Sequence, residues 1–257
     1  MECCPSAADS NFLLSRSREV VGETAWADAV ATAIHLYPTN EKVDEHNTAK
    51  LHALLTTGVA IAMIRSINSC PGAAKASKKV AGGLDNLFAV GVGAKVMLTQ
   101  NLWIKHGLVN GSSGTVVDLV GAEGVCDCII VDVPKYTGPA LCAPHPATWI
   151  PISRSTSSWF SGGKTRERKQ FPLTLAYALT IHKSQGSTFS AGTDLVIDIG
   201  SRDQAAGLTY VAFSRHSVGV NIFHAGYSNS RLEQNFLAPS FKQRVREEIR
   251  LRLLECE

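Results

Sequence analysis

The residues Gly162, Gly163, Lys164 and Thr165 spell GGKT, the sequence that ends an ATP-binding P-loop. A complete P-loop reads G-x-x-x-x-G-K-[ST], because the first glycine turns the chain so that successive backbone N–H groups can surround the phosphates. Counting back from Gly163 places Ser158 at that first position. A P-loop also leaves a buried apolar strand and opens a helix, whereas GGKT lies between a serine-rich and a basic segment. We therefore do not expect GGKT to bind ATP.

A second segment, TIHKSQGST at residues 180–188, combines groups that bind phosphate and sugar. It offers an imidazole, an ammonium, a hydroxyl and an amide before Gly186, and Ser187 can donate one more hydrogen bond. Lysine and hydroxyl groups suit a nucleic-acid backbone, and a glycine lets the main chain approach a ligand closely. The alternative is a solvated polar turn, which is the commoner explanation for any one of these residues in isolation.

A third segment, YVAFSR at residues 210–215, places an arginine at the end of an apolar run. Val211 and Phe213 supply the apolar positions, so that Arg215 emerges after them. An arginine suits the terminal phosphate of a nucleotide, because its fixed fork pairs with phosphate oxygens and its charge persists through phosphoryl transfer. The alternative is a surface salt bridge, which is the commoner role of an arbitrary arginine.

Length and composition predict a globular protein. A chain of 257 residues with 45% hydrophobic composition can bury one large domain, or one domain that carries a smaller insertion. The net charge of +3 is slight, so any affinity for nucleic acid must come from local patches. Basic residues do cluster in 164–169, and residues 241–257 interleave charges with apolar residues at helical spacing, which predicts an amphipathic end helix.

The cysteines and the N-terminus favour an intracellular protein. Seven cysteines make an odd number without the dense framework of a secreted disulfide scaffold. Zinc ligation by Cys126, Cys128, Cys142 and His145 is an alternative, yet no second paired-ligand motif completes the pattern, so we predict structural cysteines and no metal site. No apolar run approaches the roughly 20 residues that cross a bilayer, and the N-terminus lacks a signal peptide's basic and apolar regions. We expect neither export nor a membrane.

The order of predicted elements indicates an α/β domain with an all-β insertion. Residues 34–36 predict a strand. The following helix has Asn40 as its N-cap, and Val43, Asn47, Leu51 and Leu55 repeat along it at helical spacing. Short β runs follow at 94–98, 114–120 and 125–133. Helix and buried-strand signals return over residues 171–186, where Leu173, Tyr177, Ala178 and Ile181 form an apolar face, and residues 194–200 predict a further strand.

The strand DLVIDIG, residues 194–200, imitates a Walker B strand, whose terminal carboxylate holds Mg²⁺. Ile199 occupies the place of the companion acid, so we interpret Asp198 as structural.

TIHKSQGST and YVAFSR, after the upstream LYPTN and GLVNGSSGTV, resemble the petite-integration-frequency and RecD-like branch of superfamily one DNA helicases. The four motifs occur in family order across residues 34–223. The resemblance implies a RecA-like parallel-sheet domain, of the P-loop NTPase type, over residues 1–95 plus 171–257. It implies that residues 96–170 are an inserted small β-barrel of the Src-homology type. GGKT then falls in the last hairpin or loop of that barrel, where it can touch DNA phosphates nonspecifically.

The resemblance implies two sets of site residues. Those that contact single-stranded DNA are Thr39, Asn40, Thr180, His182, Lys183 and Ser184. Gly186 and Ser187 lie toward the nucleotide, and Arg215 is the catalytic arginine finger. A helix N-terminus such as that after Thr39 also favours a backbone phosphate through its dipole and free N–H groups.

The family's first RecA-like domain, with its Walker A and Walker B motifs, has no counterpart in this sequence. We therefore expect the C-terminal half of an ATP-dependent 5′-to-3′ helicase, which binds ATP and Mg²⁺ only with an N-terminal lobe and is inactive alone. The alternatives are a non-catalytic single-strand-binding module from a truncated or transposon-derived gene, and a free-standing ATPase that uses GGKT. The resemblance also implies a nuclear or mitochondrial location, and roles in DNA repair, recombination or telomere maintenance.

Overall fold

The computed structural model describes residues 7–122, 124–141, 144–185, 189, 194–200, 208–215 and 222–228. The chain forms two compact units, of which the first consists of Met1–Glu45 with Ala178–Glu257, and the second of His46–Tyr177. The second unit therefore interrupts the first in sequence. The domain boundaries near residues 95 and 171 fall within the second unit and stay a prediction. Among the described helices, none has the length and apolar character that a membrane span requires.

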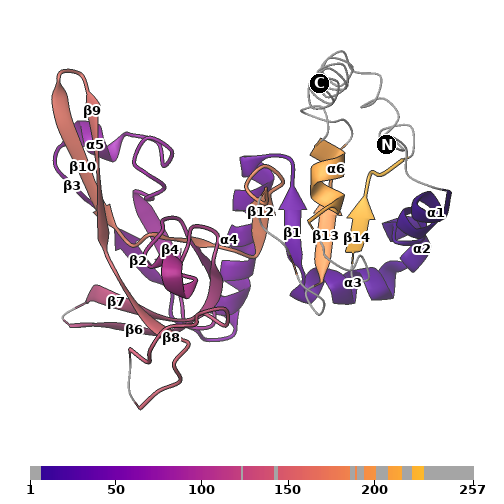
Figure 1. The fold of residues 1–257 in the computed structure, drawn as a ribbon, viewed down its shortest axis with the longest axis horizontal. Helices are drawn as coiled ribbons and strands as arrows, with labels where there is room; N and C mark the ends of the chain where they lie inside the picture. The colour runs from indigo at the N-terminus through magenta and orange to yellow at the C-terminus, as the bar shows by residue number, and fades with distance from the viewer. Residues whose placement is uncertain are drawn as a thin grey trace, which may run out of the picture. The chain divides into compact units, whose positions relative to one another are not determined.

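The first unit is built on a parallel sheet with the strand order β12-β1-β13-β14 (Figure 1). These strands are β1 Ile34–Tyr37, β12 Ala178–Thr180, β13 Leu195–Asp198 and β14 Ile222–Ala225. Parallel strands are covered on both faces, so they consist mainly of apolar residues. Leu36, Leu195 and Ile197 accordingly have no exposed surface. The expected strands at 34–36 and 194–200 and the α/β fold class are confirmed.

Helices of the first unit lie before and between these strands. They are α1 Ala7–Ser15, α2 Arg18–Val21, α3 Glu23–Thr32 and α6 Leu208–Phe213. Ala29 and Ala33, on and just after α3, pack on Val196 of β13, so small residues let this helix approach the sheet closely. The predicted end helix at 241–257 lies outside the described residues.

The helix that follows β1 begins one residue earlier than predicted, because an N-cap at Asn40 implies a first helical residue at Glu41. This helix, α4, spans Asn40–Thr56, so Asn40 is its first helical residue and the predicted N-cap is wrong. The side-chain oxygen of Thr39 accepts the N–H of Lys42 at 3.4 Å, which is the bond that an N-cap residue makes. Asn47 and Leu51 are buried as the spacing predicted, whereas Leu55 is exposed.

The second unit is an antiparallel β structure around one apolar core. Its largest sheet has the order β11-β5-β6-β7-β8, and the smaller sheets are β3-β10-β9 and β2-β4. The members are β2 Ala62–Arg65, β3 Ile67–Asn68, α5 Pro71–Ala74, β4 Leu87–Val90, β5 Lys95–Leu98, η1 Ile104–His106, β6 Ser113–Ala122, β7 Val125–Asp132, β8 Trp149–Ser153, β9 Ser155–Ser161, β10 Lys164–Gln170 and β11 Leu173–Leu175. The three short β runs predicted between 94 and 133 are confirmed as β5, β6 and β7.

GGKT lies in a β-hairpin between β9 and β10. Ser161 pairs with Lys164 across a two-residue turn, Gly162-Gly163. Both glycines have positive φ, at 61° and 73°, as the tight hairpin turn that matches strand twist requires. A P-loop connects a strand to a helix, so this geometry confirms the expected hairpin.

The helix predicted from the apolar spacing within residues 171–186 is wrong. This segment contains the strands β11 and β12 instead. Leu173 belongs to β11, which pairs antiparallel with β5, while Ala178 belongs to β12, which pairs parallel with β1. The predicted apolar positions are buried, with exposures of 1% for Leu173 and 0% for Ala178 and Ile181. The helical spacing therefore arose from two strands that bury their residues in different sheets.

Candidate nucleic-acid interface

The carboxyl ends of β1, β12 and β13 meet at one edge of the first unit's sheet. Tyr37 pairs with Thr180, and the N–H of Ile181 donates to the carbonyl of Tyr37 at 2.9 Å. On the other side of β1, Leu36 pairs with Ile197, the residue before Asp198. In open parallel sheets, ligands bind beyond this edge. The sheet thus brings together the predicted site residues that follow β1 and β12.

Thr39 and Asn40 lie where the chain leaves β1 and enters α4. The hydroxyl of Thr39 caps the helix, and the backbone carbonyl of Thr39 accepts the N–H of Val43 at 3.4 Å. Asn40 is exposed. The first N–H groups of a helix have no partner within it and carry the positive end of the dipole. The N-terminus of this 17-residue helix therefore has the chemistry that favours an anion.

Residues 180–185 form a tight turn after β12. The side-chain oxygen of Thr180 accepts the N–H of Lys183 at 3.1 Å, and its carbonyl accepts the N–H of Ser184 at 3.1 Å. This arrangement leaves the side chains of His182 and Lys183 exposed. The turn therefore presents an imidazole and an ammonium toward solvent.

Ser184 differs from its neighbours because it is fully buried. Its hydroxyl donates to the carbonyl of Ile181 at 2.7 Å, so it holds the turn closed. Its contact with DNA stays a prediction. Gly186 and Ser187, the residues predicted to lie toward the nucleotide, are outside the described residues.

Lys42, in the first turn of α4, was not among the predicted site residues. Its Nζ donates to the Asp198 carboxylate at 2.8 Å and lies 6.0 Å from the ring centre of Tyr37. Asp198 also accepts the N–H of Gly200 at 2.7 Å, which agrees with its interpretation as structural. A lysine in the first turn opposes the helix dipole, and that mismatch was a signal for a carboxylate partner.

Tyr37 stays neutral at this edge. Burial raises the pKa of Tyr37 to about 12, and the charges of Asp198 and Glu45 act in the same direction. Its hydroxyl lies 3.3 Å from Nδ1 of His35, which is buried. Tyr37 thus contributes a neutral hydroxyl to this edge of the sheet and adds no negative charge.

Arg215 follows α6 and folds back on it. Its Nε donates to the carbonyl of Val211 at 2.9 Å, and its Nη2 donates to the hydroxyl of Ser214 at 2.8 Å. A cation at the last carbonyls of a helix is favoured by the dipole. Contact with a phosphate therefore requires the guanidinium to leave these two acceptors.

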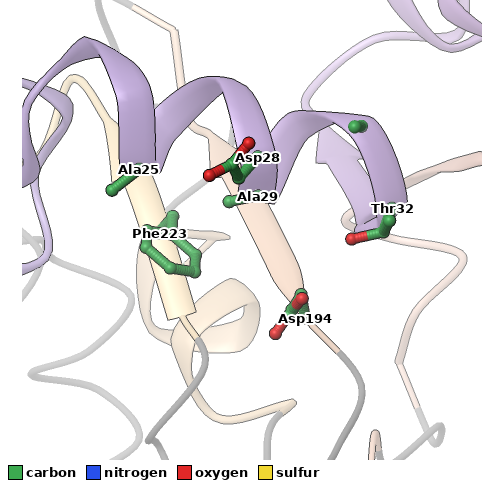
Figure 2. Close-up of a pocket in the computed structure, with 7 residues that line it drawn as sticks. Ala25, Asp28, Ala29, Thr32, Asp194 and Phe223 are labelled. Carbon is green, nitrogen blue, oxygen red and sulfur yellow. The ribbon is translucent and has the colours of Figure 1, made fainter.

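A cavity of about 520 Å³ lies at the opposite edge of the same sheet, beside α3 (Figure 2). Its lining consists of Ala25, Asp28, Ala29, Ala31, Thr32, Asp194 and Phe223. Asp194 immediately precedes β13, so this is the amino end of the strand. Two carboxylates disfavour a nucleic-acid backbone, and none of the predicted site residues lines the cavity.

Comparisons with known proteins agree on one family. The family described as "DNA helicase Pif1, 2B domain" matches residues 87–119, from β4 into β6. The ATP-dependent DNA helicase PIF1 of Danio rerio is 38% identical over 137 residues, which cover 51% of this chain and 18% of that protein. The Pif1 of Bdellovibrio bacteriovorus is 32% identical over 186 residues, or 70% of this chain and 36% of that protein. The chain belongs to the Pif1-like helicases.

Solved Pif1 structures share the fold. One is a structure of two coordinating Pif1 helicases that addresses DNA unwinding at forked double-stranded DNA. Its TM-score is 0.62 at 23% identity, and the match covers 96% of this chain and 54% of that chain. Bacteroides Pif1 bound to single-stranded DNA has a TM-score of 0.56 at 22% identity, with 89% and 51% covered. This Pif1-like chain spans about half of those structures, and between about a fifth and a third of the two relatives.

Proposed function

We propose that this chain is the C-terminal motor lobe of an ATP-dependent 5′-to-3′ DNA helicase. It binds single-stranded DNA at the carboxyl edge of the first unit's sheet and supplies Arg215 to ATP held by an N-terminal RecA-like lobe. The observation that carries the proposal is that the α4 N-terminus and the exposed pair His182–Lys183 lie at the same sheet edge. The relatives' name, ATP-dependent DNA helicase, and the DNA in the Bacteroides structure support it.

The DNA-binding step uses contacts that do not depend on sequence. The free N–H groups at the start of α4 bind one backbone phosphate, and Lys183 neutralises another. His182 and Thr180 add hydrogen bonds to phosphate or sugar. The capping bond of Thr39 and the buried hydroxyl of Ser184 keep both segments in place, so the strand meets preformed groups.

The nucleotide step uses Arg215. ATP with Mg²⁺ supplies the phosphoryl-transfer chemistry, and the guanidinium leaves Val211 and Ser214 to pair with the transferred phosphate. GGKT forms a hairpin turn, so we infer that the Walker A lysine and the Mg²⁺-binding carboxylate come from the N-terminal lobe. ATP hydrolysis therefore requires both lobes.

The test of DNA binding is fluorescence anisotropy of a labelled oligothymidylate, titrated with the chain at several salt concentrations. Lys183→Ala should weaken binding several-fold and reduce the slope of log affinity against log salt by about one. Arg18→Gln is the matched control, because it removes one positive charge from α2, where Arg18 pairs with Glu23. Thr39→Ser should bind as the wild type does, whereas Thr39→Val should bind more weakly.

Two results contradict the proposal. The first is an absence of binding at low salt, and the second is an equal loss of affinity in Arg18→Gln and Lys183→Ala. Binding that persists while a reconstituted two-lobed enzyme stays inactive assigns the chain to non-catalytic single-strand binding instead.

A further inference from the structure

Three consecutive large apolar side chains are exposed on the loop between β5 and β6. The exposed fractions are 41% for Leu102, 38% for Trp103 and 68% for Ile104. We call residues 101–112 the aromatic loop. Single exposed apolar residues are common, but a contiguous group on a loop marks a contact surface.

The aromatic loop is held rigidly by its own hydrogen bonds. Trp103 and Leu108 exchange backbone hydrogen bonds of 3.0 and 3.1 Å, and Leu108 is buried in the core. Gly107 has φ 82° and ends the η1 turn, and its carbonyl accepts the hydroxyl of Ser112 at 2.7 Å. The Asn101 side chain accepts the N–H of Asn110 at 2.8 Å. The exposed side chains are therefore presented in a fixed arrangement, so little conformational entropy opposes binding.

The ring of Trp103 is also fixed. It packs edge-on against His106, with ring centres 4.3 Å apart, and lies 6.3 Å from the ring of Tyr136. Tyr136 is buried, and its hydroxyl donates to the carbonyl of Pro139 at 3.0 Å. Trp103 therefore rests on a buried aromatic support while more than a third of its surface faces solvent.

Two lysines flank this surface. Lys105 belongs to the loop, and Lys135 belongs to a neighbouring segment whose Thr137 donates its N–H to the carbonyl of His106 at 3.2 Å. Both lysines are exposed. Residues 101–112 and 133–141 contain no aspartate or glutamate. The surface thus combines an exposed aromatic ring with positive charge.

We propose that the aromatic loop binds an unstacked base of single-stranded nucleic acid, with Trp103 stacked on the base and Lys105 and Lys135 on the adjoining phosphates. An apolar protein partner explains the exposed apolar side chains but not the two exposed lysines on segments that contain no carboxylate. Single-strand-binding proteins combine the same two features, because every base has a flat face and every linkage has a charge. The inference rests on the proposed function in that both require single strands to bind, but it adds base contact on the second unit.

The test compares two strands of equal length and charge, an oligothymidylate and its abasic counterpart. Trp103→Ala should lower affinity for the oligothymidylate at least about fivefold, as loss of one stacked base does, and change affinity for the abasic strand by less than about twofold. Trp103→Phe should retain most of the preference for bases. Trp103→Leu, which keeps an apolar side chain but has no ring, should lose it.

Two controls separate this inference from the proposed function. Phe12→Ala removes an aromatic ring of matched exposure, 39%, from α1 of the first unit, and should leave both affinities unchanged. Lys183→Ala should lower the affinity for both strands by the same factor, because it removes a phosphate contact that both strands share. Far-ultraviolet circular dichroism of each variant checks that the fold is retained.

The outcomes are distinct. Failure of the wild type to bind either strand contradicts the proposed function and this inference together. Normal salt-sensitive binding, with an unchanged preference for bases in Trp103→Leu, overturns the inference alone and assigns the surface to a protein partner. Equal loss on both strands in Trp103→Ala and Trp103→Leu also overturns it, because it shows that no base is contacted.

Discussion

Lys42 in the first turn of α4 and Asp198 at the end of β13 form an ion pair of 2.8 Å. The two side chains are 45% and 29% exposed, so solvent screens the attraction, and its contribution to stability is about 0.5–1 kcal/mol. The pair places a carboxylate at the edge that we propose binds DNA phosphates. The negative charge of Asp198 therefore opposes phosphate binding at this edge.

The first prediction follows from that opposition. Asp198→Asn keeps an oxygen for the N–H of Gly200 but removes the negative charge, so single-strand affinity should rise two- to fivefold, on the order expected for one partly screened charge. Anisotropy titrations of Asp198→Asn, Lys42→Ala and the double variant measure it. Weaker DNA binding by Asp198→Asn contradicts the assignment of this edge.

The second prediction concerns Arg168, a fully buried guanidinium in the second unit. Its donors bond the side chain of Asn68 at 3.1 Å and the carbonyls of Leu84, Ala73 and Ala76 at 3.0, 2.6 and 2.9 Å. Arg168→Ala leaves several buried acceptors without a partner, so it should lower the free energy of unfolding by about 3 kcal/mol or more. Urea denaturation measures the loss.

Lys169→Ala is the control for Arg168, because the neighbouring side chain on the same strand is exposed. It should change stability by no more than about 0.5 kcal/mol. Comparable losses in the two variants contradict the structural role of the Arg168 hydrogen bonds.

The third prediction concerns pH and His224, which is buried in the first unit. Its Nε2 lies 2.6 Å from the carbonyl of Leu13. Burial lowers the pKa of His224 below its ordinary 6.5, although the Leu13 carbonyl and Glu19 act in the opposite direction. The unfolded chain therefore binds this proton more readily than the folded one. The stability that neutral His224 contributes is full above about pH 6.5 and is lost as pH falls through the folded pKa.

Thermal unfolding at about pH 7.5 and pH 5.5 tests this dependence. The wild type should lose more stability than His224→Gln between the two values. His182→Gln, a change at an exposed histidine, should keep the wild-type loss. Identical pH dependence in the wild type and His224→Gln argues against the buried neutral imidazole.

The fourth prediction concerns the GGKT hairpin. A β-carbon on Gly163 meets no atom within 4 Å, so only its φ of 73° opposes substitution. Gly163→Asn should be tolerated, because asparagine adopts this conformation readily, whereas Gly163→Val should cost about 1–2 kcal/mol. Lys164→Ala should leave nucleotide affinity unchanged in a two-lobed enzyme. Loss of nucleotide binding in Lys164→Ala is the result that restores GGKT as a phosphate site.

Strands and turns were predictable because each rests on a local sequence pattern. The apolar run of β13 and the turn after β1 each depend on a few consecutive residues. The two consecutive glycines of GGKT favour a tight turn in the same way. The motif order also predicted the family. The helix cap moved by only one residue, from Asn40 to Thr39, since both residue types can make the same bond.

Features that depend on distant partners were not predictable. Arg168 stands in a basic run that is typical of a solvated strand, and its acceptors lie at 68 and at 73–84 in the sequence. Leu173 and Ala178 fall at apolar positions that suit a helix, and only their partners, Leu98 and His35, make them strands. The bonds from Arg215 to Val211 and Ser214 are local, but they form only because α6 is a helix.

We propose that Arg215 binds the phosphate of ATP while His182 and Lys183 bind DNA, and one pair of titrations tests this division most directly. The chain is joined to the N-terminal lobe of a Pif1 relative, and ATP turnover and single-strand affinity are measured on each variant. Arg215→Ala should leave DNA affinity nearly intact and reduce turnover by about 10³- to 10⁵-fold, the scale of arginine fingers. The double change His182→Ala with Lys183→Ala should weaken DNA binding and blunt its stimulation of turnover, while nucleotide affinity changes little. Lower DNA affinity in Arg215→Ala, with normal turnover at saturating DNA, contradicts the account.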